Sequence, residues 1–220
     1  MKTIKIGLLG LGNIGTGTYK TLEMNRNEVE SSLGAKIEIV KILEKDVDRD
    51  RGIDVPRDKF TINPDEIFND PEIDIVIELL GGIEPATSFM LAAMKNGKHV
   101  VSANKAAIAA NYRELTEAAK TNNVMFKFEA SVGGGIPILG TLLGPLRANK
   151  FEEVLGILNG TTNYILTMMT KEGLDYDTAL KDAQTQGFAE ADPTADVEGI
   201  DAANKLSILI ALMFDKYVAP

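Results

Sequence analysis

The sequence predicts an α/β protein: a doubly wound parallel sheet followed by a second, smaller domain. In the first part of the chain, short apolar runs alternate with stretches of helical periodicity, a pattern typical of strands joined by crossover helices. A glycine-rich string at 133–137 then interrupts the pattern, and one strand-like run follows it. We therefore expect a domain over residues 1–135 and an α+β domain over 136–220 that is incomplete, because one strand cannot form a sheet.

The individual elements follow from the apolar runs and from the residues that end them. Continuous hydrophobicity, typical of strands buried on both faces, predicts strands at 4–9, 36–43, 73–80, 98–102 and 124–128. Helices are predicted between them at 13–32, 85–96 and 112–122, and the charged stretch 46–56 is expected to form a loop. In the second domain we expect a helix at 138–147, a strand at 151–158 and mostly helix up to Phe214.

Composition excludes several classes of function. The net charge of -9 argues against a nucleic-acid surface or an anionic membrane as a partner. The absence of cysteine excludes disulfides, thiolate metal sites and cysteine nucleophiles. The N-terminus enters a strand pattern without the features of a signal peptide, and no apolar run reaches the roughly 18 residues that span a bilayer. These observations favour a soluble, cytoplasmic protein.

A glycine-rich loop lies between the first predicted strand and the first predicted helix, where it fits the pattern G-x-G-x-x-G. In this context the first glycine forms a tight turn, the second lets the backbone approach a pyrophosphate and the third lets helix and strand pack closely. The alternative is a glycine-rich turn without a ligand. The context favours a Rossmann-type domain whose dinucleotide site includes Gly10, Gly12 and Gly15.

The end of the second predicted strand leaves the choice between NAD and NADP open. Glu44 lies there, and a carboxylate can bind the ribose 2′-hydroxyl. Lys45, Arg49 and Arg51 follow at once, and a basic cluster can hold a 2′-phosphate. We place Lys45 in the cofactor site without assigning a preference.

Candidates for acid–base chemistry are lysines and carboxylates. The only histidine, His99, begins a predicted strand and is expected to be structural. Lys105 follows the strand at 98–102, where ligands bind at the carboxyl ends of parallel strands. Asp201 and Lys205 lie four residues apart on one face of a helix that is otherwise almost wholly apolar, which favours a cleft over an ordinary exposed ion pair.

Seven strings, in the same order, resemble the N-terminal part of the homoserine dehydrogenase family, and together they span nearly the whole chain. They are Gly10–Gly15, Glu78–Gly82, Ser102–Lys105, Glu129–Pro137, Asn159–Asn163, Gly187–Pro193 and Asp196–Lys205. The resemblance implies NAD(P)-dependent interconversion of L-homoserine and L-aspartate 4-semialdehyde, within threonine, methionine and isoleucine biosynthesis. It also implies a homodimer in the full-length protein.

The same resemblance implies roles for individual residues. Lys205 is similar to the proton-carrying lysine of the family, and Lys105 to a second lysine between nicotinamide and substrate. Glu190 and Asp201 match substrate-binding carboxylates. The positions that match cofactor contacts of the family are Leu11, Asn13, Ile14, Gly81, Ser102 and Gly187. A monovalent-cation site for Na⁺, built largely from backbone carbonyls, is implied at Glu129, Val132, Gly134 and Ile136.

The sequence offers three alternatives to this interpretation. Aspartate-semialdehyde dehydrogenase chemistry needs a cysteine, which this chain lacks. A non-catalytic NAD(P)-binding module, or an inactive fragment, is the second reading, because the family's chain continues well past Pro220. The third is a divalent metal bound by Glu190, Asp192 and Asp196. The chain also departs from the family at Phe188, where tyrosine is common.

Overall fold

The computed structural model describes residues 1–220, which divide into two compact units, Met1–Ser131 and Val132–Pro220. The predicted boundary between residues 135 and 136 lies close to this division. None of the helices combines the length and the apolarity needed to cross a bilayer. Each unit is described separately.

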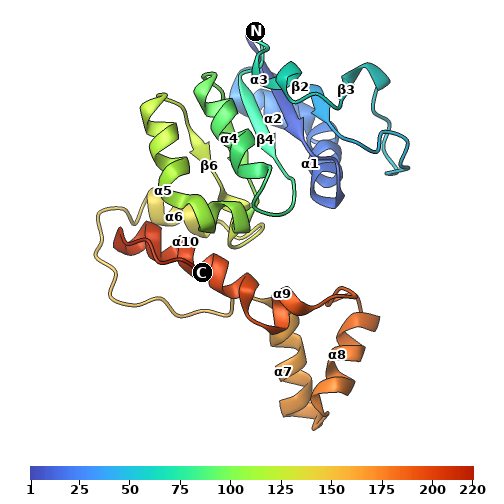
Figure 1. The fold of residues 1–220 in the computed structure, drawn as a ribbon, viewed down its shortest axis with the longest axis vertical. Helices are drawn as coiled ribbons and strands as arrows, with labels where there is room; N and C mark the ends of the chain where they lie inside the picture. The colour runs from blue at the N-terminus through green and yellow to red at the C-terminus, as the bar shows by residue number, and fades with distance from the viewer. The chain divides into compact units, whose positions relative to one another are not determined.

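The first unit contains a parallel sheet of six strands in the order β3-β2-β1-β4-β5-β6 (Figure 1). This is the predicted doubly wound Rossmann-type topology, with the reversal of strand order between β1 and β4. Its strands are β1 (Thr3–Leu9), β2 (Lys36–Leu43), β3 (Phe60–Thr61), β4 (Ile75–Glu78), β5 (His99–Ser102) and β6 (Phe126–Lys127). Its helices are α1 (Asn13–Met24), α2 (Arg26–Leu33), α3 (Asp65–Phe68), α4 (Ala86–Lys95) and α5 (Lys105–Thr121), with short 3-10 turns at Arg57–Lys59 and Glu129–Ser131.

Helices pack on both faces of this sheet because successive strand residues point to opposite sides. Ile6 and Leu8 of β1 form a core cluster with Tyr19 of α1. Gly7 faces the other way, toward Ile67 of α3. The helices α4 and α5 lie side by side (Figure 1). The sheet is therefore enclosed, and its carboxyl edge carries the loops where ligands bind in such folds.

Two predicted helices of this unit differ from the structure. The helix predicted at 13–32 is broken at Asn25, whose side-chain amide donates to the Thr21 carbonyl oxygen; asparagine favours such helix ends. The helix predicted at 112–122 begins earlier, at Lys105, and Asn111 has non-helical backbone angles. Sequence periodicity therefore identified only the part of α5 beyond this kink. The strand β3 and the helix α3 were missed because elements of two and four residues have no readable period.

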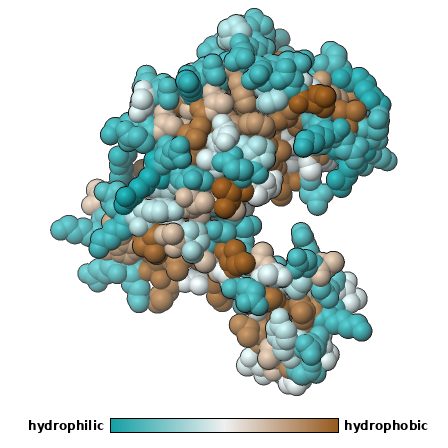
Figure 2. Space-filling model, viewed as in Figure 1, coloured by the Kyte–Doolittle hydropathy of each residue, from teal (hydrophilic) through white to brown (hydrophobic).

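The second unit is helical, with α6 (Ile138–Leu143), α7 (Gly160–Glu172), α8 (Tyr176–Thr185), α9 (Thr194–Val197) and α10 (Ile200–Phe214). The predicted helix at 138–147 ends at Leu143. The strand predicted at 151–158 does not form. A strand requires a partner for its backbone hydrogen bonds, and this unit contains no other strand. Large apolar side chains of this unit remain at the surface, among them Leu155 and Ile157; Figure 2 shows hydrophobic side chains reaching the surface in places.

Candidate functional site

The glycine loop of the first unit has the geometry that the motif predicts. Gly10 follows β1 with φ +92, a conformation that favours glycine. A Cβ on Gly15 would lie 2.2 Å from the Gly10 carbonyl oxygen, so α1 can approach the loop this closely only through glycine. Gly12 is the N-cap of α1, no side chain caps the helix, and the space above Gly12 is open. The first N–H groups of α1 therefore point to where a phosphate binds in such loops.

The carboxyl end of β2 faces this loop through Glu44. The Leu11 N–H donates to Glu44 Oε2 at 3.0 Å, and the Asp46 N–H donates to Oε1 at 3.0 Å. Burial raises the pKa of Glu44, but these backbone bonds and the Arg51 guanidinium outweigh it, so the pKa is lowered overall. Glu44 is therefore held as a carboxylate beside the loop.

The three basic residues after β2 differ in what they contact. Arg51 is nearly buried, and its nitrogens donate to the carbonyl oxygens of Leu11, Arg49 and Asp46 at 2.7–2.9 Å. A guanidinium nitrogen of Arg51 also lies 3.3 Å from Glu44 Oε2. The side chains of Lys45 and Arg49 are exposed. Of the three basic residues, only Arg51 therefore has its charged group hydrogen-bonded to the glycine loop, through the Leu11 carbonyl oxygen.

Two cavities of about 340 Å³ flank the glycine loop within the first unit. One is lined mainly by apolar residues and by Glu44, and its wall is made of Gly10, Leu43, Glu44, Lys45, Ile62, Pro64, Leu80, Gly81, Pro85 and Phe89. The other lies over the start of α1 and is lined by Leu11, Gly12, Asn13, Thr16, Arg49, Asp50 and Arg51. The structure thus gathers the predicted cofactor residues Gly10 to Asn13, Lys45 and Gly81 around these two spaces, whereas Ile14 is exposed on α1.

A buried carboxyl group that sequence reasoning did not assign lies at the end of β4. Glu78 accepts hydrogen bonds from Ser102 Oγ at 2.6 Å and from the Leu80 N–H at 2.7 Å. Burial raises the pKa of Glu78, and the hydrogen bonds offset the effect only in part. Ser102 in turn accepts from the Asn104 N–H at 3.0 Å, directly before Lys105, the first residue of α5. The signal available in the sequence was an acidic residue closing an apolar strand.

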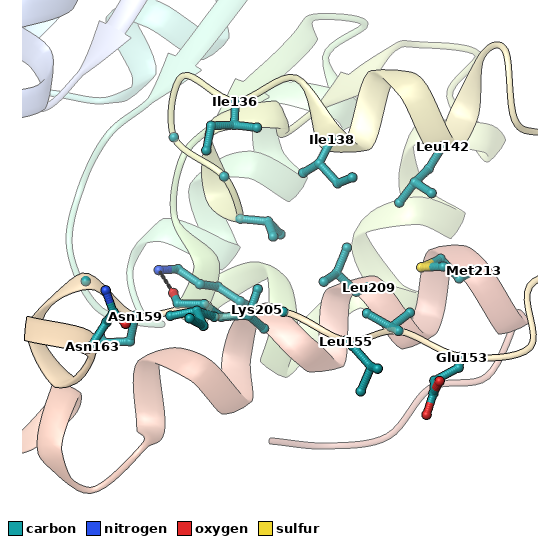
Figure 3. A pocket seen from close by; sticks show the side chains of 18 residues that line it. Ile136, Ile138, Leu142, Glu153, Leu155, Asn159, Asn163, Lys205, Leu209 and Met213 are labelled. Atoms are coloured by element: carbon teal, nitrogen blue, oxygen red, sulfur yellow. Dashed lines mark hydrogen bonds between the residues drawn. The ribbon is translucent and has the colours of Figure 1, made fainter. Parts of the chain in front are cut away.

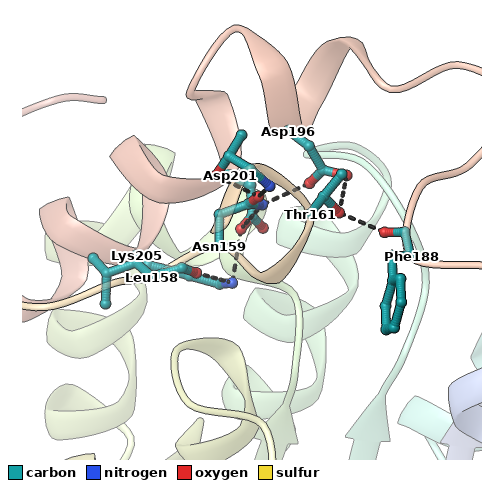
Figure 4. A network of polar contacts seen from close by, with 8 residues as sticks. Leu158, Asn159, Thr161, Phe188, Asp196, Asp201 and Lys205 are labelled. Atoms are coloured by element: carbon teal, nitrogen blue, oxygen red, sulfur yellow. Dashed lines mark hydrogen bonds and ion pairs between the residues drawn. The ribbon is translucent and has the colours of Figure 1, made fainter. Parts of the chain in front are cut away.

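The second unit contains a network of polar side chains around α10 (Figure 4). Lys205 Nζ donates to Asp201 Oδ2 and to the Leu158 carbonyl oxygen, both at 2.7 Å. Asn159 Nδ2 donates to Asp201 Oδ2 at 3.0 Å and to Asp196 Oδ1 at 2.7 Å. The Asp201 side chain is only 6% exposed. The predicted pair of Asp201 and Lys205 is therefore a hydrogen-bonded ion pair with a buried aspartate and a partly buried lysine, rather than an exposed ion pair.

A cavity of about 850 Å³ opens beside Lys205. Figure 3 shows Lys205, Asn159 and Asn163 at one end of it, and Leu155, Leu209 and Met213 toward the other. A cavity with largely apolar walls and a few convergent polar groups is the usual form of a small-molecule site. Lys205 lines this cavity from an otherwise apolar helix, in the arrangement that the sequence predicted.

Other predicted site residues are not joined to this group. Glu190 is exposed, and no group of three acidic or histidine side chains is arranged to hold a metal, so Glu190, Asp192 and Asp196 form no divalent-metal cluster. Gly187 lines a separate cavity of about 510 Å³ together with Phe188. Val132, Gly134 and Ile136 line the large cavity, where the Ile136 carbonyl oxygen accepts from the Ile138 N–H; the cation site stays a prediction. His99 Nδ1 accepts from the Met125 N–H, the structural role expected of it.

Comparisons with known proteins agree along the chain. Residues 10–129 match the NAD-binding domain of homoserine dehydrogenase, and residues 137–220 match the homoserine dehydrogenase family model. Homoserine dehydrogenase of Bacillus subtilis is 45% identical over 218 residues, 99% of this chain and 50% of that protein. The crystal structure of a homoserine dehydrogenase from Thiobacillus denitrificans superposes with a TM-score of 0.90 at 47% identity, covering 96% of this chain and 48% of that one.

A third relative is a complex with a dinucleotide. A hyperthermophilic archaeal homoserine dehydrogenase in complex with NADPH superposes with a TM-score of 0.80 at 26% identity, covering 98% of this chain and 71% of that one. The chain spans about half the length of the curated relatives that it matches. The dinucleotide-binding fold, the buried lysine–aspartate pair and these matches lead to one conclusion: the chain belongs to the homoserine dehydrogenase family.

Proposed function

We propose that the protein to which this chain belongs catalyses the NAD(P)-dependent interconversion of L-homoserine and L-aspartate 4-semialdehyde. The observation that carries the proposal is the Asp201–Lys205 ion pair on a mostly apolar helix, in which Asp201 is buried and Lys205 lines a cavity. A dinucleotide-binding module without chemistry has no use for this pair. A nicotinamide cofactor, when bound, would supply the hydride transfer that this interconversion requires.

Lys205 has the contacts expected of a proton carrier. An ammonium group has three donors, and two are directed to Asp201 and to the Leu158 carbonyl oxygen. The third can reach the oxygen of a substrate in the cavity, where it would supply the proton as an aldehyde is reduced to an alcohol. In the reverse direction the same nitrogen would take the hydroxyl proton. Asp201 would orient Lys205. The placement of Lys105 between the nicotinamide and this substrate stays a prediction.

The substrate's charged groups require polar partners, and the resemblance assigns this role to Glu190 and Asp201. Asp201 supports the assignment through its place beside Lys205, whereas Glu190 stands on the loop that precedes α9, exposed to solvent. Glu190→Gln is expected to raise KM for homoserine with little change in kcat. An unchanged KM would remove Glu190 from the substrate site.

The cofactor would be held by the glycine loop, the start of α1 and the cavity beside Glu44. These residues fit a dinucleotide because Gly12 leaves open space in front of uncapped helix N–H groups. We also infer a preference for NAD over NADP. Glu44 is kept ionised beside the loop, where a carboxylate binds the ribose hydroxyls and repels a phosphate, and Arg51 is committed to backbone oxygens. Glu44→Gln should lower the ratio of KM for NADP to KM for NAD.

The test of the proposed function is homoserine-dependent reduction of NAD(P). The 220-residue chain and a chain extended to the full length of the relatives should be measured side by side. The extended chain is expected to turn over homoserine; if it binds the oxidised cofactor NAD(P) but reduces none of it with homoserine present, the proposed activity is wrong. A homodimer and a bound Na⁺ stay predictions for the full-length protein.

A further inference from the structure

Glu78 is the buried acidic residue at the carboxyl edge of the sheet that the proposed reaction does not use. It is the last residue of β4, opposite Leu9 of β1 on one side and Ser102 of β5 on the other. The strand order reverses between β1 and β4, which is where ligands bind in open α/β sheets. The Glu78 side chain is 0% exposed, and none of the ion pairs of the structure includes it. A fold rarely buries such a group without a use for its hydrogen bonds.

The two carboxyl oxygens of Glu78 have different main partners, and Oε1 also accepts a longer hydrogen bond from Asn104 Nδ2 at 3.4 Å. Oε1 accepts the Leu80 N–H at 2.7 Å and so fixes the turn that leaves β4. This turn forms part of the wall of the cavity beside the glycine loop, through Leu80 and Gly81. It also lies against Gly10, where a Cβ would come within 3.1 Å of the Leu79 carbonyl oxygen. One oxygen of Glu78 thus holds the wall of the predicted dinucleotide site.

The other oxygen leads to the start of α5. Oε2 accepts from Ser102 Oγ at 2.6 Å, which leaves the lone pairs of that hydroxyl to accept the Asn104 N–H at 3.0 Å. Asn104 is the N-cap of α5: its Oδ1 accepts the Ala107 N–H at 3.1 Å, and its Nδ2 donates to the Gly82 carbonyl oxygen at 2.8 Å. The next residue is Lys105. Asn104 Nδ2 also donates to the Leu80 carbonyl oxygen at 3.2 Å, so the turn after β4 and the helix that carries Lys105 are joined both directly through Asn104 and through the buried carboxyl group of Glu78.

We propose that Glu78 is a positioning residue that sets the turn 79–82 and the N-terminus of α5 relative to each other, and thereby places the dinucleotide wall and Lys105. This inference rests on the proposed function for its effect on turnover, but its effect on dinucleotide binding does not depend on the substrate. Because its side chain is fully buried, Glu78 would act through Leu80, Ser102 and Asn104 rather than through a ligand.

Glu78→Gln is the informative substitution because it preserves size. Its amide oxygen can still accept the Leu80 N–H, but its NH₂ group then faces Ser102 Oγ, whose own hydrogen loses its acceptor. In the full-length protein we expect kcat to fall and Kd for NAD(P)H to rise. The two changes combined should amount to roughly ten- to a hundredfold, which is the range produced when positioned groups are displaced. In a Ser102→Ala background the same substitution should add less than about threefold, because the shared contact is already lost.

Lys98→Met is the matched control. Lys98 is also buried and also makes a hydrogen bond, to the Asp70 carbonyl oxygen, but it lies at the opposite end of β5. It should lower the unfolding midpoint while leaving kcat and Kd within about twofold. If Glu78→Gln behaves like Lys98→Met, with a lower midpoint and unchanged Kd and kcat, Glu78 is structural and the proposal is overturned. If the wild-type protein fails to oxidise homoserine, the proposed function fails, while the Kd comparison still tests Glu78.

Discussion

The two units differ in how completely they enclose their own apolar segments. In the first unit every strand of the sheet has a hydrogen-bonded neighbour, and helices pack on both faces. In the second, the segment 151–158 has a strand-like sequence but no strand partner, and Leu155 and Ile157 are 84% and 77% exposed. The predicted cofactor loop lies in the enclosed unit, and the lysine–aspartate pair in the open one. Substitutions should therefore separate dinucleotide binding from proton transfer.

The largest separation is expected from Lys205→Ala in the full-length protein. Loss of the proton carrier should lower kcat by roughly 10²–10⁴-fold, whereas Kd for NAD(P)H, determined by the first unit, should stay within about twofold. Steady-state turnover and fluorescence titration measure the two quantities. Lys205→Arg is the control, since arginine keeps the charge but does not give up its proton. Turnover that survives both substitutions would exclude Lys205 as the proton carrier.

The converse separation is expected from Gly15→Ala. Its Cβ would lie 2.2 Å from the Gly10 carbonyl oxygen, so α1 or the loop must shift. We expect a loss of about 1–3 kcal/mol in unfolding free energy, as in other overpacked sites, together with weakened NAD(P)H binding. Gly17→Ala on the same helix is the control, because open space surrounds Gly17. It should leave binding unchanged and stabilise the helix slightly; equal effects of the two would contradict the close-packing argument.

Two glutamates within the first unit should respond to pH with opposite signs. Folding raises the pKa of Glu78 above 4.5 and so favours its protonated form. The contribution of Glu78 to the stability of the folded protein is therefore fully present below pH 4.5 and is lost as pH rises through the folded pKa. The pKa of Glu44 is lowered below 4.5, so its contribution is present above that pH and is lost as pH falls through the folded pKa. Denaturant unfolding measures the free energy of unfolding at each pH. In Glu78→Gln this free energy should depend less on pH above pH 4.5 than in the wild type, and in Glu44→Gln it should depend less on pH below pH 4.5. Unchanged pH profiles would contradict both assignments.

What the sequence could predict depended on how local each determinant is. The glycine loop and the spacing of Asp201 and Lys205 were readable because both depend on neighbours along the chain. The contacts of Glu44 and Arg51 could not be predicted in this way, because Arg51 binds Leu11, which lies 40 residues away in the sequence. Nor could the role of Glu78, whose partner Ser102 lies 24 residues away. The strand predicted at 151–158 does not form, because a strand-like apolar run becomes a strand only where another strand pairs with it.

The smallest effect is expected where that pattern lies. Leu155→Ala should change the unfolding free energy of the 220-residue chain by no more than about 0.5 kcal/mol, because the side chain is already exposed. Leu139→Ala, in the buried face of α6, is the matched control and should cost about 2–5 kcal/mol. The comparison becomes sharper in a chain extended to the length of the relatives. If the added residues provide a strand partner for 151–158, Leu155→Ala should become more costly there while the effect of Leu139→Ala stays the same. An equal, small effect of Leu155→Ala in both chains would mean that this segment remains open, and that the difference between the two units belongs to the protein as a whole.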